Sequence, residues 1–340
     1  MKAQIDRKVG EGTYTFEAVP CCICNGAEFE ELAQKDRYGL FMPVVICKQC
    51  GLIQTNPRMS QESYRQFYQT EYRKLYMGDA APTREFFHHQ VRRGRAILAR
   101  LVASSCLPNR MSDLFVLEVG CGAGGILQCF REAGCATVGI DLDREYLEFG
   151  RREYGLNLVE GTLETIPIDP QPDVIIYSHV LEHILDPNAE LQRVQRLLAP
   201  QGVVYVEVPG VKNLARACRM DFLSWLQNAH TTHFSLATLG NLMAKNGFAM
   251  HSGTEEACCI YRPRRGDAAP SAVVNDYAEA MDYLLAMEQW RRVIAPWYFP
   301  VRRRVIAAGI ELLRLLGLHG AARRFYPTMQ HEHPLPDDDA

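Results

Sequence analysis

Apolar and polar positions follow two rhythms along the middle of the chain. Short apolar runs of strand length, such as LFVLEV, DVIIYS and GVVYVEV, alternate with longer segments whose apolar residues recur at helical spacing, such as REYLEFGRREYG. This alternation predicts right-handed crossovers and a mostly parallel sheet. After Val208 the pattern becomes irregular as far as Thr232. It then predicts a helix from about Ser235 to Asn246 and two more strands, FAMHS and ACCIY.

Helical spacing also marks the segments on either side of this region. From Ser60 to Cys106 it predicts two helices, with Ser60 as the N-cap and a break near residues 78–82. From Pro263 onward the chain is again helical, and residues 301–325 form an amphipathic basic helix. We expect this helix to pack against the main domain with solvated arginines, and a membrane-surface contact is the alternative.

Composition places the chain among globular proteins. Of its 340 residues 47% are hydrophobic and 23% charged, and the net charge of −3 predicts no nucleic-acid partner. No secretion signal or membrane-spanning run is recognised, so we expect a cytoplasmic protein. The length suggests several parts: a module over 1–59, a helical lid or linker over 60–110, a main domain over 111–262 and a helical extension over 263–340. The oligomeric state is not predicted.

A glycine cluster between a strand and a helix marks a candidate ligand site. In the run LFVLEVGCGAGG, Gly120 permits the tight turn, Gly122 allows a ligand to approach the backbone, and Gly124 lets the helix sit close. Asp141 ends the next strand, where a carboxylate can accept hydrogen bonds from both hydroxyls of a ribose. The letters also satisfy the dinucleotide fingerprint G-x-G-x-x-G, so an NAD-dependent oxidoreductase remains an alternative.

Four segments in order extend this pattern into a family resemblance. Residues 118–124, EVGCGAG, resemble the E-x-G-x-G-x-G signature of class I S-adenosylmethionine-dependent methyltransferases. The resemblance continues through GID, EGTLE, DVIIYSHVLEH and LLAPQGVVYVEVPG, and it covers roughly residues 110–262. It implies a Rossmann-like sheet of seven strands, mostly parallel, whose final strand is antiparallel.

The resemblance also implies S-adenosylmethionine as the cofactor. Thr162 stands where the family commonly has an aspartate that holds the adenine amino group, and a threonine hydroxyl can hydrogen-bond but carries no charge. The cofactor contacts that the resemblance implies are Glu118, Gly120, Gly122, Gly124, Asp141, Leu142, Thr162, Leu163 and Ser178.

The run His179-Val-Leu-Glu182-His183 matches H-x-x-E-H, a zinc peptidase pattern when it lies on a helix. Here it begins at the end of a predicted buried strand, which disfavours the peptidase. In the methyltransferase interpretation Ser178 and His179 lie closest to the methyl donor. Glu182 and His183 are then structural.

The segment NAHTTHFS, residues 228–235, resembles the corresponding segment of methyltransferases in deoxysugar and polysaccharide biosynthesis. In those sugar C-methyltransferases the histidine matching His230 is the general base, and the position matching His233 is usually tyrosine. The resemblance implies a small-molecule, sugar-like acceptor methylated on carbon or oxygen, with His230, His233 and His179 as catalytic candidates. The alternatives are a histidine that caps the helix beginning at Ser235, and a methyltransferase-fold binding protein without activity.

Two C-x-x-C pairs precede the main domain. Cys21 and Cys24, with Cys47 and Cys50, have the spacing of a closed Cys₄ site for structural Zn²⁺, and Cys22 is a spare thiol. A redox role for one pair is the alternative. The run CKQCGLIQTNPR also resembles the N-terminal zinc element found before many sugar and polysaccharide methyltransferase domains.

Overall fold

The computed structural model describes residues 1–76, 81–107, 110–218, 220–264, 272–294, 296–298, 301 and 304–305. The chain divides into two compact units, Met1–Leu285 and Ala286–Ala340. Helix α11 (Tyr277–Val293) spans the boundary between them. The basic helix expected over 301–325 lies almost wholly outside the described residues.

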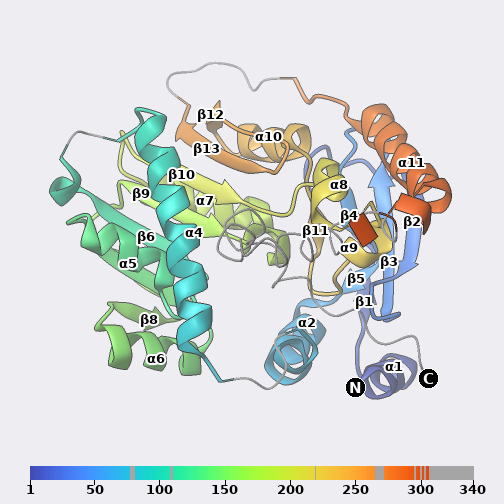
Figure 1. Cartoon of the computed structure of the whole chain (residues 1–340), viewed down its shortest axis with the longest axis horizontal. Coiled ribbons are helices and arrows are strands. Elements are labelled where there is room, and N and C mark those ends of the chain that lie inside the picture. The colour runs from blue at the N-terminus through green and yellow to red at the C-terminus, as the bar shows by residue number, and fades with distance from the viewer. Residues whose placement is uncertain are drawn as a thin grey trace. The chain divides into compact units, whose positions relative to one another are not determined.

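A mixed seven-stranded sheet organises the larger unit (Figure 1). Strand β13 runs antiparallel to both of its neighbours, and the other strand pairs are parallel. The prediction of a mostly parallel seven-stranded sheet with an antiparallel final strand is confirmed. The strand order is β12 (Phe248–Ser252), β13 (Cys258–Pro263), β10 (Val203–Glu207), β9 (Val174–Ser178), β6 (Phe115–Val119), β7 (Ala136–Asp141) and β8 (Leu158–Glu160).

Helices cover both faces of this sheet, because its central strands are apolar on both sides. In β9, Val174 and Ile176 pack into the core cluster that includes Phe87, Ile126 and Leu147 of helices α4, α5 and α6. The alternate residues of the strand pack on the other side, with helices α7 and α10. The helices are α4 (Arg84–Ala103), α5 (Gly125–Glu132), α6 (Arg144–Tyr154), α7 (Pro187–Leu197) and α10 (Leu236–Lys245).

The N-terminal region contributes a second, antiparallel sheet that is shared with the main domain. Its four strands have the order β11-β4-β3-β2, and β11 comes from far along the chain, with Thr232 paired to Gln54 and His233 to Ile53. The elements of this region are α1 (Lys2–Gly10), β1 (Phe16–Glu17), β2 (Phe29–Lys35), β3 (Phe41–Cys47), β4 (Ile53–Thr55), β5 (Arg58–Met59) and β11 (Thr232–His233).

The helical segment predicted from Ser60 to Cys106 is only partly regular. Ser60 is an N-cap as expected, since its hydroxyl accepts a hydrogen bond from the amide of Ser63 (3.4 Å). The helix continues through a π-turn, and residues 78–80 of the expected break lie outside the described residues. The remaining elements are α2 (Gln61–Phe67), η1 (Tyr68–Tyr72), α3 (Arg73–Tyr76), η2 (Met111–Asp113), η3 (Leu181–His183), η4 (Val211–Asn213), α8 (Leu214–Ala217) and α9 (Phe222–Trp225).

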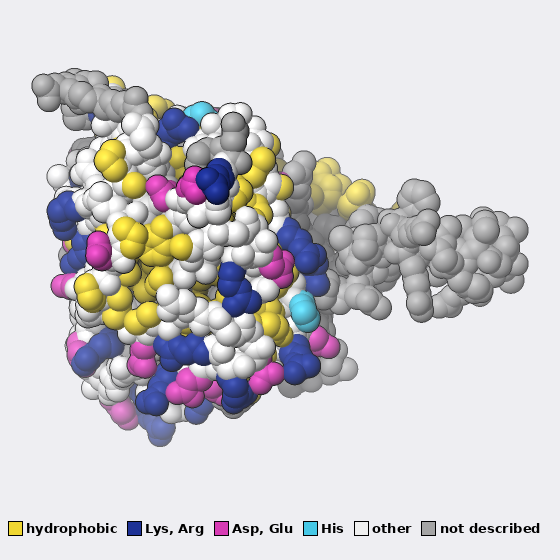
Figure 2. All heavy atoms as spheres, turned by 90° about the vertical axis from the view of Figure 1, so that its left-hand side faces the viewer, with side chains coloured by type: hydrophobic (Ala, Val, Ile, Leu, Met, Phe, Trp, Pro, Cys, Tyr) yellow, Lys and Arg dark blue, Asp and Glu magenta, His cyan; other side chains and the backbone are white. Residues whose placement is uncertain are grey.

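The surface and the helices fit the composition. Figure 2 shows basic and acidic side chains interspersed, with apolar side chains between them, on the face that lies at the left of Figure 1. Among the described residues, no helix combines the length and the apolar character that crossing a bilayer requires.

Candidate active site

The loop after β6 adopts a conformation that requires glycine. Gly120, Gly122 and Gly124 have φ values of 70°, 52° and 78°, a backbone region that side chains rarely adopt. A Cβ atom at Gly120 would lie 2.4 Å from Cγ2 of Val180. Gly124 directly precedes α5, so the free backbone N–H groups of the first helical turn lie at the carboxyl edge of the sheet.

The carboxylate of Asp141 is fixed beside this loop at the end of β7. Its Oδ2 accepts a hydrogen bond from the amide of Gly122 (2.7 Å), and its Oδ1 accepts one from the amide of Asp143 (2.8 Å). These two bonds set the orientation of the carboxylate. A carboxylate oxygen can accept more than one hydrogen bond, so Asp141 is suited to hold the vicinal hydroxyls of a ribose.

Two polar atoms at the same edge are buried without a hydrogen-bond partner among the described residues. They are Oε2 of Glu118, near the end of β6, and Oγ of Ser178, the last residue of β9. Glu118 is only 2% exposed, and burial, together with the charge of Asp141, raises the pKa of its carboxyl well above the usual value. Buried polar atoms are almost always hydrogen-bonded, so these atoms fit a site that a polar ligand completes.

The residues expected around an adenine ring come from the loops after β7 and β8. The amide of Gly161 donates to the carbonyl of Asp141 (2.9 Å), which holds the two loops side by side. Leu142 is 69% exposed, and an exposed apolar side chain at a site edge fits a flat ring packed over it. Thr162 and Leu163 follow Gly161 directly, and the Thr162 hydroxyl lies within hydrogen-bond distance of the Glu164 amide (3.3 Å).

Histidines from two distant segments converge beside this edge. His179 follows β9, His183 ends η3, His230 lies just before β11, and His233 ends β11. The ring centres of His183 and His230 are 4.7 Å apart, and those of His230 and His233 are 5.9 Å apart. His230 and His233 are 4% and 2% exposed. In contrast, the side chain of His179 is 34% exposed, so His179 is the candidate that solvent reaches.

Two carboxylates flank His179. Its Nδ1 lies 3.6 Å from Oε1 of Glu182, and its Nε2 lies 3.4 Å from Oε1 of Glu207. Burial acts to lower the pKa of His179, but the two carboxylates outweigh it and raise the pKa to about 9. Burial lowers the pKa of His230 well below its usual value and that of His233 to about 3. In this environment His179 carries a proton at neutral pH and the two buried histidines are uncharged.

A row of tyrosines from α2 to α3 packs on the histidine cluster. The rings of Tyr68 and Tyr72 stack with centres 4.4 Å apart, and both meet the ring of His183 edge-on. The hydroxyl of Tyr64 lies within hydrogen-bond distance of the carbonyls of His183 (2.7 Å) and Ala229 (2.6 Å). These aromatic residues line one side of the histidines.

The places of Glu182, His183 and Glu207 in this arrangement were not predicted from the sequence. The H-x-x-E-H run lies on a strand end and a 3-10 turn rather than on a helix, yet its last two residues, Glu182 and His183, belong to the cluster and not only to the scaffold. Glu207 was not singled out. Its signal is its position, because it ends the apolar run VVYVE at the carboxyl edge of the sheet.

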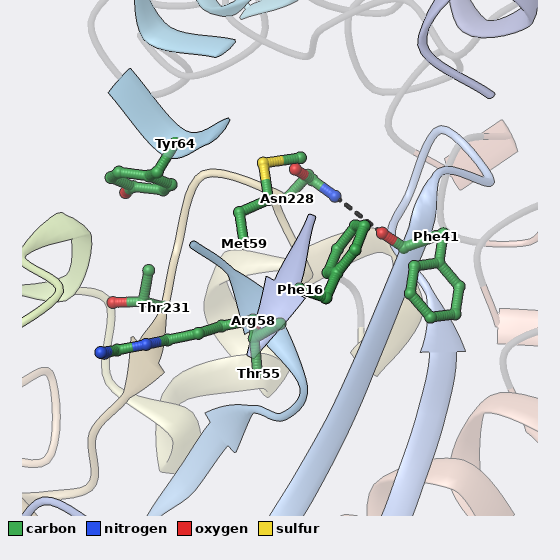
Figure 3. A pocket seen from close by; sticks show the side chains of 8 residues that line it. All are labelled: Phe16, Phe41, Thr55, Arg58, Met59, Tyr64, Asn228 and Thr231. Atoms are coloured by element: carbon green, nitrogen blue, oxygen red, sulfur yellow. Dashed lines mark hydrogen bonds between the residues drawn. The ribbon is translucent and has the colours of Figure 1, made fainter. Parts of the chain in front are cut away.

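A small cavity lies between the N-terminal region and the segment before β11. Its lining includes the hydroxyl-bearing side chains of Tyr64, which lies on α2, and of Thr231, which directly follows His230 (Figure 3). Asn228 closes one side by donating to the carbonyl of Phe41 (3.0 Å). The complete lining is Phe16, Phe41, Thr55, Arg58, Met59, Tyr64, Asn228 and Thr231.

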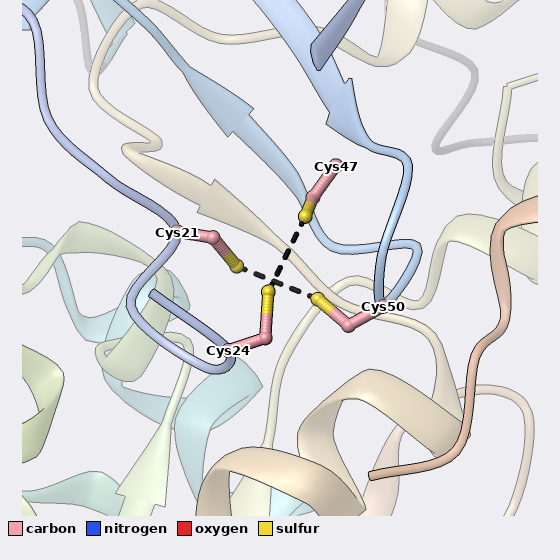
Figure 4. A group of neighbouring side chains, drawn as sticks. All are labelled: Cys21, Cys24, Cys47 and Cys50. Atoms are coloured by element: carbon pink, nitrogen blue, oxygen red, sulfur yellow. Dashed lines mark hydrogen bonds between the residues drawn. The ribbon is translucent and has the colours of Figure 1, made fainter. Parts of the chain in front are cut away.

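The four predicted cysteine ligands form a compact cluster. Sγ of Cys21 lies 3.4 Å from Sγ of Cys50, and Sγ of Cys24 lies 3.5 Å from Sγ of Cys47 (Figure 4). These distances are too long for disulfides. Zn–S bonds of about 2.3 Å in a tetrahedron put the sulfur atoms about 3.8 Å apart, so the cluster fits one tetrahedral ion. Cys22 is not part of it.

Comparison with known proteins supports the methyltransferase interpretation. The sequence profile of a family described as a methyltransferase domain matches residues 86–252. The chain is 32% identical over 102 residues to the ubiquinone biosynthesis O-methyltransferase of Haemophilus ducreyi, covering 27% of this chain and 43% of that protein. It is 27% identical over 190 residues to the C-methyltransferase NovU of Streptomyces niveus, covering 51% of this chain and 42% of that protein.

The chain spans less than half the length of these curated relatives. Among solved structures, the PH0226 protein of Pyrococcus horikoshii aligns with 57% of this chain and 99% of its own, at 16% identity and a TM-score of 0.44. The family match covers the glycine loop, Asp141 and all the histidines of the cluster. The family match and the similar proteins therefore support an S-adenosylmethionine-dependent methyltransferase domain over residues 86–252.

Proposed function

We propose that the chain binds S-adenosylmethionine at the carboxyl edge of the seven-stranded sheet and transfers its methyl group to a small-molecule acceptor. When bound, this cofactor supplies a methyl group activated by a positively charged sulfur. The observation that carries the proposal is the carboxylate of Asp141, held by the amides of Gly122 and Asp143 beside a glycine loop. Such a fixed pair of acceptor oxygens matches a ribose diol.

The other contacts follow from the same geometry. Leu142 and Leu163 flank the adenine ring, and the hydroxyl of Thr162 is available to its polar edge. The unpartnered buried oxygens of Glu118 and Ser178 face the amino-acid end of the cofactor, beside the N-terminus of α5. A carboxylate there interacts favourably with the free N–H groups of the helix.

We assign the proton transfer to His179 rather than to the more buried His230 and His233. His179 follows β9 at the carboxyl edge, and its side chain is the exposed one of the three. The acting base is the neutral form of this ring, which is the minor form below its pKa of about 9 and increases as the pH rises. When the neutral ring takes a proton from the acceptor, the carboxylates of Glu182 and Glu207 stabilise the imidazolium, as the aspartate does in a Ser-His-Asp triad. Alignment of acceptor, methyl and sulfur supplies much of the remaining rate.

We propose a sugar-like acceptor, methylated on carbon or oxygen. The support is the resemblance of the segment around His230 to sugar C-methyltransferases. It is also the position of this segment, which lies against the histidine cluster and one wall of the small cavity.

We also propose that Cys21, Cys24, Cys47 and Cys50 hold one structural Zn²⁺. The four sulfur atoms all lie within 4.8 Å of one another, and four thiolates leave no open position for chemistry. The site joins the turn before β2 to the turn between β3 and β4. It therefore stabilises the small sheet that carries β11.

Calorimetric titration with S-adenosylhomocysteine tests the cofactor site. In Asp141→Ala the carboxylate that would hold two ribose hydroxyls is lost. Charge-assisted hydrogen bonds contribute about 1.5–3 kcal/mol each, so we expect affinity to fall about a hundredfold or more. NAD is titrated in parallel. Micromolar binding of S-adenosylhomocysteine and none of NAD would support the proposal.

Asp113→Ala serves as the matched control, because Asp113 lies just before β6 with its side chain exposed. It should bind S-adenosylhomocysteine as the wild type does. Wild-type affinity in Asp141→Ala, or binding of NAD alone, would overturn the proposed cofactor site. Binding without methyl transfer to any acceptor in a screen that begins with nucleotide sugars would favour a binding protein without activity.

A further inference from the structure

The histidine cluster contains a set of donor atoms that converge on one point. Glu182 and His183 lie in the turn η3, and His230 lies in the segment before β11. One ligand atom from each of these three residues lies within 4.8 Å of the other two. The proposed methyl transfer uses Glu182 only through His179 and does not use His183, so the convergence of both residues with His230 needs its own explanation.

The carboxylate of Glu182 lacks the partners that a buried charge requires. Glu182 is 1% exposed, and among the described residues neither of its oxygens has a hydrogen-bond partner. The nearest ring nitrogens are Nδ1 of His179 at 3.6 Å and Nε2 of His183 at 3.9 Å. A carboxylate removed from water without hydrogen bonds is costly. The imidazolium of His179 offsets part of that cost without a hydrogen bond, and a bound cation would supply the direct contacts that the carboxylate lacks.

His183 is held in the orientation typical of a metal ligand. Its Nδ1 lies 3.1 Å from the carbonyl oxygen of Ala229 and 2.6 Å from the hydroxyl of Tyr68. Because a carbonyl oxygen can only accept, this contact assigns the proton to Nδ1 and leaves the lone pair on Nε2, the nitrogen nearest Glu182. Metal-bound histidines usually donate their other ring N–H to a carbonyl or carboxylate in this way.

His230 completes the set. It is 4% exposed, and its Nδ1 is buried without a partner among the described residues. Its backbone is fixed, since its amide donates to the carbonyl of Gln227 (2.9 Å) and its carbonyl accepts from the hydroxyl of Thr55 (3.1 Å). These bonds limit how far the ring can move from that of His183, whose centre is 4.7 Å away.

We propose that Glu182, His183 and His230 bind one divalent transition-metal ion at the acceptor end of the site. Two imidazoles and one carboxylate form the donor set of catalytic Zn²⁺ and of non-haem Fe²⁺. Three protein ligands would leave coordination positions open for small ligands such as water. The inference does not rest on the proposed function, because the metal site is defined by the protein alone.

Metal content and Co²⁺ binding of the full chain test this proposal. Protein purified without chelator should contain two equivalents of divalent metal by mass spectrometry, one in the Cys₄ cluster and one here. Co²⁺ added to metal-stripped protein separates the two sites, since only thiolate ligands give intense charge-transfer bands in the near ultraviolet. Glu182→Gln and His230→Gln should lose the second equivalent and weaken its Co²⁺ affinity by more than about a hundredfold.

His251→Gln is the matched control, because His251 is exposed on β12 and should leave both equivalents in place. Thermal melting and S-adenosylhomocysteine binding show that each variant is folded. A wild type that takes up only the thiolate-bound equivalent would overturn the proposal, as would variants that bind Co²⁺ like the wild type. If the protein still bound S-adenosylhomocysteine with either of these two results, only the metal site would be overturned and the proposed methyl transfer would be unaffected.

Discussion

His179 combines an unusual backbone with a position between two carboxylates. Its φ of 58° lies in the left-handed region, and its amide donates to the carbonyl of Glu207 (2.8 Å). Backbone held in this region is concentrated at functional sites. The same conformation turns the chain away from β9 and leaves the ring between Glu182 and Glu207. The turn therefore fixes the side chain at the end of the strand.

Replacing His179 by asparagine tests its role in proton transfer. Asparagine tolerates the left-handed region, so we expect a folded protein with wild-type affinity for S-adenosylhomocysteine. Loss of a positioned base typically lowers the rate by about 10²–10⁴, so kcat should fall by that factor while KM changes little. The measurement is transfer of a labelled methyl group to the first acceptor found by screening.

His251→Asn, an exposed histidine on β12, controls for the substitution itself and should turn over at the wild-type rate. A His179→Asn variant that keeps its kcat would assign His179 a structural role only. A rise in KM without a change in kcat would point to acceptor binding instead of proton transfer.

At the level of secondary structure, the main domain was predictable because its signals are local. The runs LFVLEV and DVIIYS are apolar on both faces, as strands covered by helices on both sides must be, and they became β6 and β9. The glycine loop was predictable for the same reason, since the left-handed turn at Gly120 and the helix start after Gly124 are properties of adjacent residues.

The small sheet and the histidine cluster could not be predicted from local pattern. Strand β2 reads FEELAQK, which has no regular alternation, and its burial shows none either. Strand β11 has only two residues, and its partner β4 lies far away in the sequence. Because η3 and the segment before β11 meet only in three dimensions, Glu182, His183 and His230 gave no shared signal in the sequence.

The start of α10 is joined to the segment before α11. Ser235 caps the helix, as its hydroxyl accepts from the amide of Thr238 (3.2 Å) and the Thr238 hydroxyl accepts from the Ser235 amide (2.9 Å). The Ser235 hydroxyl also lies 2.5 Å from Oδ2 of Asp276, whose Oδ1 accepts from Nζ of Lys212 (2.8 Å). Asp276 is 2% exposed, so this link is buried.

Ser235→Ala should therefore cost more stability than loss of an ordinary cap. An N-cap contributes about 1 kcal/mol, and a buried hydrogen bond to a charged group about 1.5–3 kcal/mol. We expect urea unfolding to show a loss of about 2–4 kcal/mol. Thr83→Ala removes the exposed N-cap of α4 and should cost about 1 kcal/mol. Equal losses in the two variants would show that the bond to Asp276 contributes nothing.

In the larger unit as a whole, the cysteine cluster and the acceptor end of the site are mechanically linked. The cluster includes Cys47 at the C-terminal end of β3 and Cys50 in the turn that leads to β4. Strand β4 pairs with both β3 and β11. The amide of Thr55 donates to the carbonyl of Thr231 (3.0 Å), and the Thr55 hydroxyl donates to the carbonyl of His230. The strand that the cysteines stabilise thus positions the segment that carries His230.

Removal of the proposed zinc should therefore loosen the histidine segment but not the cofactor edge. In Cys47→Ser we expect one equivalent of zinc to be lost and the thermal midpoint to fall, because structural zinc contributes directly to folding. Hydrogen exchange should speed up at residues 228–233 and remain slow in β6 and β7. Affinity for S-adenosylhomocysteine should stay within about threefold, since Asp141 and the glycine loop belong to the other sheet.

Cys22→Ser is the matched control, because Cys22 is adjacent to Cys21 yet outside the cluster. It should keep its zinc, its thermal midpoint and slow exchange at residues 228–233. If Cys22→Ser instead lost zinc, the neighbouring thiol would be a ligand and the assignment of Cys21 would be wrong. If Cys47→Ser lost zinc without any change at residues 228–233, the small sheet would not position His230, and the β11 pairing would have to be maintained by the main domain alone.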